Sequence, residues 1–163
     1  MGPRDLLKSL VKSNDGMINT YLNDLSDADL FVRPTPNANH IAWQLGHLIN
    51  SEQSLFKYVP GAAGIELPAG WGEKYSGEAS RSETTTGYLT KAQYLEWYKK
   101  SRDNVMKTID RISDKDLDTP TQGRMAQFFP TIGEVLILMA NHPLMHAGQI
   151  VVVRRKLGKP VVI

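Results

Sequence analysis

Two histidines of this sequence are spaced so that they could bind one metal ion. His142 and His146 stand four residues apart. On a helix this spacing puts both imidazoles on one face, from which they can reach a single ion at about 2.1 Å each. Apolar residues before and after the pair keep the same three- and four-residue rhythm, so both rings should face inward, where unpartnered imidazoles are costly to desolvate. The pair therefore predicts a shared metal ion, with ordered water or hydrogen-bonding neighbours as the open alternative.

A third ligand is offered by His47. It belongs to a polar stripe on an earlier helical segment, formed by His40, Gln44, His47, Ser51 and Ser54. Polar residues at these positions of a bundle helix indicate a cavity rather than solid packing. His40 lies about 10 Å from His47 along the helix axis, too far to share its ion, and is expected at the cap or rim of the helix.

Three further polar residues are candidate auxiliaries, although none is an unambiguous general base. Gln149 could hydrogen-bond a ligand histidine or the substrate, or be satisfied by a neighbouring helix. Glu52 is rotated toward the apolar seam of its helix, which favours a supporting or helix-contact role over ligation. Arg102 could meet an anionic group, but an arginine whose charged end reaches solvent is the favoured interpretation.

Pro143 separates the paired histidines. The segment His142-Pro143-Leu144-Met145-His146 has the outline of the H-E-x-x-H metalloprotease motif, with proline where that motif needs its glutamate. A zinc-protease mechanism is therefore disfavoured. A proline inside a helix also removes one backbone hydrogen bond, so a bend is expected, which either aims His142 or has no functional effect.

The composition narrows the chemistry further. The chain has no cysteine, which excludes thiolate nucleophiles, cysteine-ligated metals and disulfide chemistry. A net charge of +2 gives no electrostatic reason to expect nucleic acid or anionic lipid as a partner. The longest wholly apolar stretch, Val135 to Ala140, is too short to span a membrane, and no signal-peptide pattern opens the sequence. We expect a cytoplasmic protein that has no membrane partner.

Four helical segments should position these residues. Apolar periodicity and capping patterns predict helices over about residues 3–25, 39–58, 90–112 and 131–156. Their apolar stripes are too narrow to be buried alone, so residues 1–163 are expected to form one all-α domain, a four-helix bundle. Residues 25–30 and 112–117 resemble each other, which suggests a weak internal repeat or a chance likeness of polar turns. The long connection over residues 59–87 is either a loop over a pocket mouth or a surface insertion.

Two segments carry a resemblance to a known family. They are His40-Ile41-Ala42-Trp43-Gln44-Leu45-Gly46-His47-Leu48 and Asn141-His142-Pro143-Leu144-Met145-His146-Ala147-Gly148-Gln149-Ile150. With the helix order and the long second connection, the chain resembles the DinB/YfiT-like superfamily of metal-binding bundles over nearly its whole length. This resemblance implies an up-down-down-up bundle in which His47, His142 and His146 hold a divalent ion. Imidazole ligands suit zinc or nickel, with iron or manganese as alternatives.

The resemblance also implies a function. Characterised relatives include thiol-dependent S-transferases and maleylpyruvate isomerases, so we expect a metal-dependent enzyme that acts on a small molecule with an external low-molecular-weight thiol. A metal-dependent hydrolase and a metal- or small-molecule-binding bundle without turnover remain alternatives. A role in stress response and a homodimer are further expectations from the family. The dimer also rests on the last helix being apolar almost all round, with these residues off its seam: Leu136, Leu138, Leu144, Ile150 and Val152.

Overall fold

The chain folds into helices joined by irregular segments, as a computed structural model of residues 1–161 shows. Four helices are long: α1 (Pro3–Leu22), α2 (Ile41–Phe56), α4 (Lys91–Arg111) and α5 (Ile132–Lys156). The short elements are α3 (Trp71–Lys74) and the 3-10 turns η1 (Ala28–Phe31), η2 (Ala79–Arg81), η3 (Asp114–Asp118) and η4 (Gly123–Gln127). No strand forms within residues 1–161, so the all-α prediction is confirmed.

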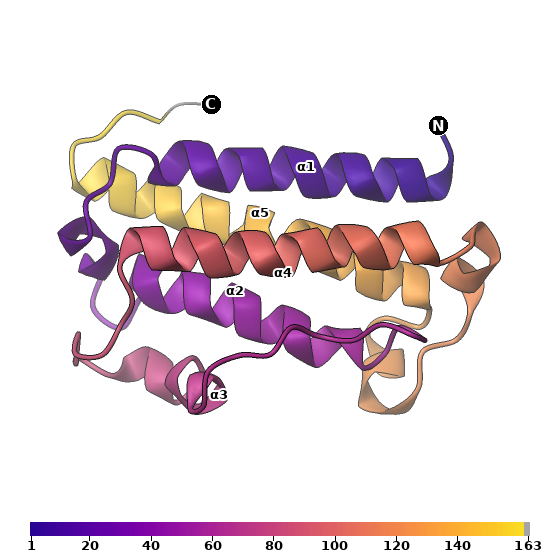
Figure 1. Ribbon diagram of the computed structural model, residues 1–163. Helices are drawn as coiled ribbons and strands as arrows, with labels where there is room; N and C mark the ends of the chain where they lie inside the picture. The colour runs from indigo at the N-terminus through magenta and orange to yellow at the C-terminus, as the bar shows by residue number, and fades with distance from the viewer. Residues whose placement is uncertain (162–163) are drawn as a thin grey trace.

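The four long helices form a bundle in which α1 and α5 run one way and α2 and α4 the other (Figure 1). α1 packs against α5 and α4, and α2 packs against the same two helices. The long connection between α2 and α4 returns the chain to the end at which α2 began (Figure 1). The expected four-helix bundle with an up-down-down-up order is therefore confirmed.

Side-chain caps define where three of the long helices begin. Thr90 and Thr131 each accept a hydrogen bond from the backbone N–H three residues on, and that residue's side chain accepts from the threonine N–H. At the start of α2, Nδ1 of His40 accepts from the N–H of Trp43 at 3.1 Å. Each cap satisfies N–H groups that have no partner inside the helix. The predicted cap position of His40 is confirmed.

The two similar segments that follow α1 and α4 share a local structure. Ser26 and Asp29 exchange side-chain-to-backbone hydrogen bonds, and Ser113 and Asp116 do the same. A 3-10 turn lies at each of these places. α1 therefore ends at Leu22, earlier than predicted, because the residues that follow form their own capped turn.

A polar layer crosses the middle of the bundle. The buried apolar side chains form two clusters, one around Ile18, Leu45 and Val153 and the other around Val11 and Ile109. Between them lie buried polar residues from all four long helices: Asn14, Glu52, Ser101, Arg102 and His146. The candidate ligands therefore sit at the level where the core is polar.

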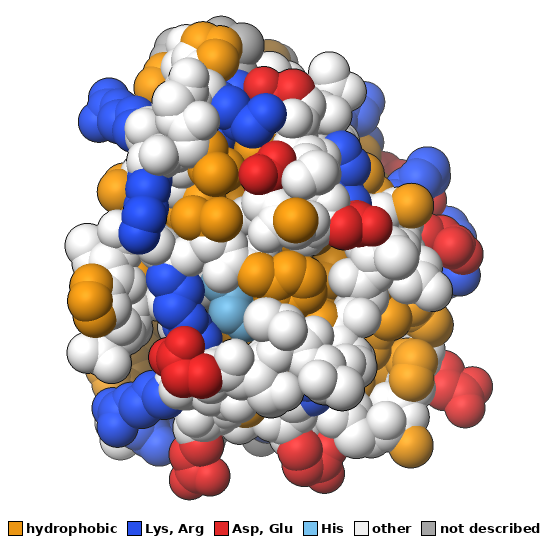
Figure 2. Space-filling model, turned by 90° about the vertical axis from the view of Figure 1, so that its left-hand side faces the viewer, with side chains coloured by type: hydrophobic (Ala, Val, Ile, Leu, Met, Phe, Trp, Pro, Cys, Tyr) orange, Lys and Arg blue, Asp and Glu red, His pale blue; other side chains and the backbone are white. Residues whose placement is uncertain are grey.

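α5 is long and apolar enough, by length and composition alone, to cross a membrane. Core helices of soluble-type bundles have the same character, and Val135, Met139 and Val153 of α5 are fully buried among the other helices. At the end of the bundle shown in Figure 2, acidic and basic side chains are interspersed rather than gathered by sign.

The prediction that five apolar residues of α5 lie off its buried seam needs correction at two positions. Leu136 and Ile150, which the sequence placed off the seam, are fully buried. Because α5 packs against both α1 and α2, its buried face is wider than a single seam. The large apolar side chains that α5 does expose are Ile137, Leu144, Met145 and Val152.

Candidate functional site

The structure brings three histidines together between α2 and α5. One ring nitrogen from each of His47, His142 and His146 lies within 4.8 Å of the other two. The Nε2 atoms of His142 and His146 are 3.2 Å apart. Two nitrogens held about 2.1 Å from one ion at tetrahedral or octahedral angles are roughly 3.0 to 3.4 Å apart. The donor set and its spacing therefore fit a divalent metal ion.

Gln44 determines which nitrogen of His146 is free. Its Nε2 donates to the Asn39 carbonyl at 2.9 Å, so its Oε1 remains an acceptor. That Oε1 lies 3.1 Å from Nδ1 of His146, which must therefore carry the proton and donate. The lone pair of His146 is then on Nε2, the atom that faces His142. Metal-binding histidines are commonly oriented in this way, by a hydrogen bond on the second ring nitrogen.

Three neighbours hold the ring of His47, and only Ser51 was indicated by the polar stripe in the sequence. Trp43, one turn earlier on α2, stacks on its ring with 4.6 Å between centroids and 12° between planes. A hydrogen bond to the Tyr75 backbone favours the charged form of His47, but burial outweighs it and lowers the pKa. The Ser51 hydroxyl lies 3.3 Å from Nε2 of His47. These contacts fix the ring plane and leave Nε2 on the polar side of α2.

The long connection between α2 and α4 packs against α2 beside His47. The Trp71 indole donates to the Gly46 carbonyl at 3.1 Å, and the Trp43 indole donates to the Ser76 carbonyl at 3.2 Å. A Cβ atom at Gly46 would lie only 2.1 Å from the Tyr75 ring, so only glycine permits this approach. The connection therefore supports α2, because its buried aromatic residues anchor it there.

Burial keeps the three imidazoles neutral near pH 7. Desolvation, with a smaller contribution from the neighbouring histidines, lowers the pKa of His142 to about 4 and that of His146 to about 3. Neutral imidazoles offer the lone pairs that metal binding requires.

Glu52 and Arg102 contact each other instead of the histidines. The Arg102 guanidinium and the Ser101 hydroxyl each donate to one oxygen of the Glu52 carboxylate. Nε of Arg102 is 2.8 Å from Oδ1 of Asp15. Arg102 is only 3% exposed, so the interpretation of it as an arginine reaching solvent is wrong. The buried carboxylate of Glu52 and the partly buried one of Asp15 are partners for its charge, and they lie on two other helices, so the pattern of a single helix does not reveal them.

Pro143 explains the place of Arg102. In a helix the Met139 carbonyl would accept from the N–H of residue 143, which proline lacks. Nη1 of Arg102 donates to this carbonyl at 2.8 Å. Asn14 donates to the next carbonyl, that of Ala140, at 2.9 Å. Side chains from α4 and α1 thus satisfy the carbonyls of α5 around the proline, one turn before His142.

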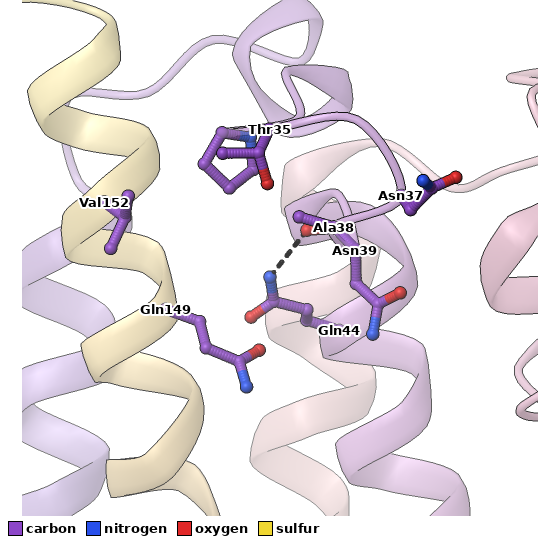
Figure 3. Close-up of a pocket in the computed structure, with 8 residues that line it drawn as sticks. Thr35, Asn37, Ala38, Asn39, Gln44, Gln149 and Val152 are labelled. Atoms are coloured by element: carbon purple, nitrogen blue, oxygen red, sulfur yellow. Dashed lines mark hydrogen bonds between the residues drawn. The ribbon is translucent and has the colours of Figure 1, made fainter.

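Gln149 is exposed and lines a cavity of about 310 Å³ beside the histidines. Figure 3 shows Gln149 of α5 and Gln44 of α2 facing each other below Thr35. We call this cavity the amide pocket; its lining residues are Pro34, Thr35, Asn37, Ala38, Asn39, Gln44, Gln149 and Val152. None of them is charged, and four are carboxamides. A hydrogen bond between Gln149 and a candidate ligand histidine stays a prediction, because the ring nitrogens of His146 face Gln44 and His142.

A second cavity, of about 420 Å³, adjoins His142. We call it the Lys57 groove; its lining residues are Asn50, Ser51, Ser54, Leu55, Lys57, Tyr58, Met125, Phe129, Leu138 and His142. One wall is polar and belongs to α2, while the other is apolar and includes residues near η4. The three histidines therefore lie between two cavities of different chemistry.

Comparisons with known proteins agree with this geometry. The sequence profile of the DinB superfamily matches residues 13–150. A crystal structure described as the conserved protein of locus from Enterococcus faecalis is similar in fold, with a TM-score of 0.77 and 17% sequence identity over 98% of this chain and 99% of that one. No curated protein matches the sequence. Because the family profile covers most of its length, the chain belongs to the DinB superfamily.

Proposed function

We propose that this protein is a metal-dependent enzyme in which His47, His142 and His146 hold a divalent ion, zinc or nickel in preference to iron or manganese. The observation that carries the proposal is the convergence of three neutral imidazoles within 4.8 Å. The tautomer that Gln44 imposes on His146 supports it, because Nε2 is then free to bind. Membership of a metal-binding superfamily points the same way.

The proposed reaction is a thiol-dependent transfer or isomerisation in the cytoplasm. A divalent ion with three protein ligands supplies Lewis-acid chemistry that lowers the pKa of a thiol or water at its open positions. The chain has no cysteine, so the sulfur must come from a second small molecule. The two cavities beside the histidines give room for two reactants.

The chain's own residues have separable roles in this proposal. Gln44 and the Tyr75 backbone orient ligand rings, and the Ser51 hydroxyl lies where it can hydrogen-bond a molecule that approaches His47. Glu52 and Arg102 stabilise the bundle beneath the site, since their charges are already paired with each other. Gln149 borders the amide pocket and can contact a reactant there.

Thiol consumption tests the proposal. Protein purified without a histidine tag is incubated with low-molecular-weight thiols and a panel of electrophiles, and free thiol is measured over time. We expect turnover that a chelator abolishes, that added zinc or nickel restores, and that His142→Ala removes. Hydrolysis of ester substrates without thiol would favour the hydrolase alternative. Metal binding without turnover of any substrate would favour a binding protein.

A further inference from the structure

The Lys57 groove runs along α2 away from the histidines. Its lining residues include Ser51 and His142, at the candidate ligands, and Lys57, which follows the last residue of α2. Ser51 and Lys57 are six residues apart, which corresponds to about 9 Å along a helix axis. α5 runs antiparallel to α2. Leu138 precedes His142 by one turn of α5, so it lies further from the histidines, on the side toward which α2 runs to Lys57. A ligand that fills it would therefore be elongated, with one end beside the histidines.

The groove combines apolar side chains with a single cation. Met125, Phe129 and Leu138 line it and are partly buried. Lys57 is the only lysine, arginine or carboxylate among the lining residues, and within residues 1–161 no carboxylate pairs with it inside 4 Å. Its Nζ lies 5.0 Å from the centroid of the Tyr58 ring, which also lines the groove. A cation beyond an apolar segment complements an amphipathic anion.

We propose that the Lys57 groove binds a small amphipathic anion: an apolar or aromatic segment lies against Met125, Phe129 and Leu138, and a carboxylate at its far end meets Lys57. The end beside His142 carries the group that reacts, an assignment that rests on the proposed function. The amide pocket has no charged lining residue and would take the uncharged, polar reactant. The site thus distinguishes its two reactants by charge.

A fluorescent carboxylate and its neutral ester test this inference. The probes are 6-(dansylamino)hexanoate and its methyl ester, which share one apolar body and differ in charge. Binding is measured by dansyl fluorescence on metal-free and on zinc-loaded full-length protein. We expect the acid to bind about threefold to tenfold more tightly than the ester, the advantage given by a partly exposed ion pair. Lys57→Gln should remove this difference and leave ester binding unchanged.

Two tryptophan variants locate the binding. Leu138→Trp fills the groove and should weaken both probes at least about tenfold, a loss typical of blocked apolar burial. Ile137→Trp, one residue earlier, fills a different apolar cavity of about 390 Å³ between α1 and α5 and should change neither. That cavity is bordered by Asp114, Asp118 and Glu134, which disfavour an anion. Lys57→Gln alters an exposed side chain, so its result does not depend on tolerance of a larger core residue.

Several results would overturn the inference. The first is equal affinity for acid and ester in the unaltered protein, and the second is an acid preference that survives Lys57→Gln. The third is loss of binding on Ile137→Trp instead of Leu138→Trp. The fourth is no binding of either probe at millimolar concentration. Zinc titration of the same samples separates the two proposals. Stoichiometric zinc without an acid preference overturns the groove assignment alone, whereas an acid preference without zinc binding overturns the proposed function alone.

Discussion

Hydrogen bonds to individual side chains decide what each histidine can do. The Asn39 carbonyl orients Gln44, and Gln44 accepts the proton of Nδ1 of His146, a residue on another helix. The lone pair of His146 is therefore on Nε2, where it can bind a metal ion. His40 shows the opposite outcome, since its Nδ1 is occupied by the Trp43 N–H and its ring packs against Phe31 at 5.4 Å between centroids. The same residue type thus serves a candidate metal site in one place and a helix cap in another.

Replacing Gln44 tests its effect on His146. Gln44→Met keeps the approximate volume but cannot accept from Nδ1, so we expect metal affinity to fall about 10- to 100-fold, as for other residues that orient metal ligands. Affinity is measured by competition with a chromophoric chelator. Gln149→Met, at an exposed position, is the matched comparison and should have a much smaller effect. Equal effects of the two variants would show that Gln44 does not orient the ligand.

His40 should make the metal-free protein less stable in acid. Burial lowers its pKa to about 4 from an ordinary value of 6.5, so between these values the unfolded chain binds more protons than the folded one. Its contribution to stability is present above pH 6.5 and is lost as the pH falls toward 4, by about 3 kcal/mol. Asparagine also caps helices but does not titrate. The free energy of unfolding in urea, measured from pH 7.5 to pH 4.5, should therefore fall less for His40→Asn; parallel curves would contradict this assignment.

At the scale of elements, α5 contains a buried proline, Pro143, and still continues as a helix to Lys156. Side chains of neighbouring helices replace the hydrogen bonding that the proline disturbs, since Arg102 and Asn14 donate to the Met139 and Ala140 carbonyls. The long connection has a comparable effect on α2, where Tyr75 packs on Gly46. The two helices that carry the candidate metal ligands, α2 and α5, are thus each stabilised by groups from another part of the chain.

A double-mutant cycle measures the first dependence. Arg102→Lys should lower the free energy of unfolding by about 2 kcal/mol, because it leaves buried hydrogen-bonding groups without partners. Pro143→Ala returns an N–H to the Met139 carbonyl, so in that background Arg102→Lys should cost about 1 kcal/mol less. Strictly additive effects in urea unfolding would show that Arg102 does not compensate for the proline.

Two glycine substitutions measure the second dependence. Gly46→Ala places a Cβ against the Tyr75 ring, so we expect a loss of about 1 to 3 kcal/mol and weaker metal binding through His47. Gly16, also inside a helix, has open space at its Cβ position, and Gly16→Ala should stabilise the protein by up to about 1 kcal/mol without changing metal binding. Similar results for both variants would contradict the role of the Tyr75 contact.

At the scale of the whole molecule, the sequence predicts what depends on local spacing. The relation of His142 to His146 follows from one helical turn, and the polar stripe around His47 indicated which residue would face them. The burial of Arg102 was not predictable, because it depends on Glu52 on another helix and on a carbonyl that Pro143 leaves unpaired. The hydrogen bond that orients His47 comes from the backbone of Tyr75, in an irregular connection. The pattern of side chains in the sequence does not indicate such a backbone contact.

We propose that the protein forms a homodimer through the exposed apolar stripe of α5, which includes Ile137 and Leu144. Such side chains are more stable when a second chain covers them. Light scattering at micromolar concentration should give twice the chain mass of 18.2 kDa. The double substitution Ile137→Lys with Leu144→Lys should halve the measured mass; a monomer for the unaltered protein would exclude the dimer.

The central claim is that three histidines from α2 and α5 hold one divalent ion, and metal stoichiometry tests it most directly. Protein purified without a histidine tag is incubated with zinc, separated from free ion and analysed by mass spectrometry for metal per chain. We predict one ion in the unaltered protein and in His40→Asn, and loss of most of it in His47→Ala. Full occupancy in His47→Ala, or no retained ion in the unaltered protein, would contradict the claim.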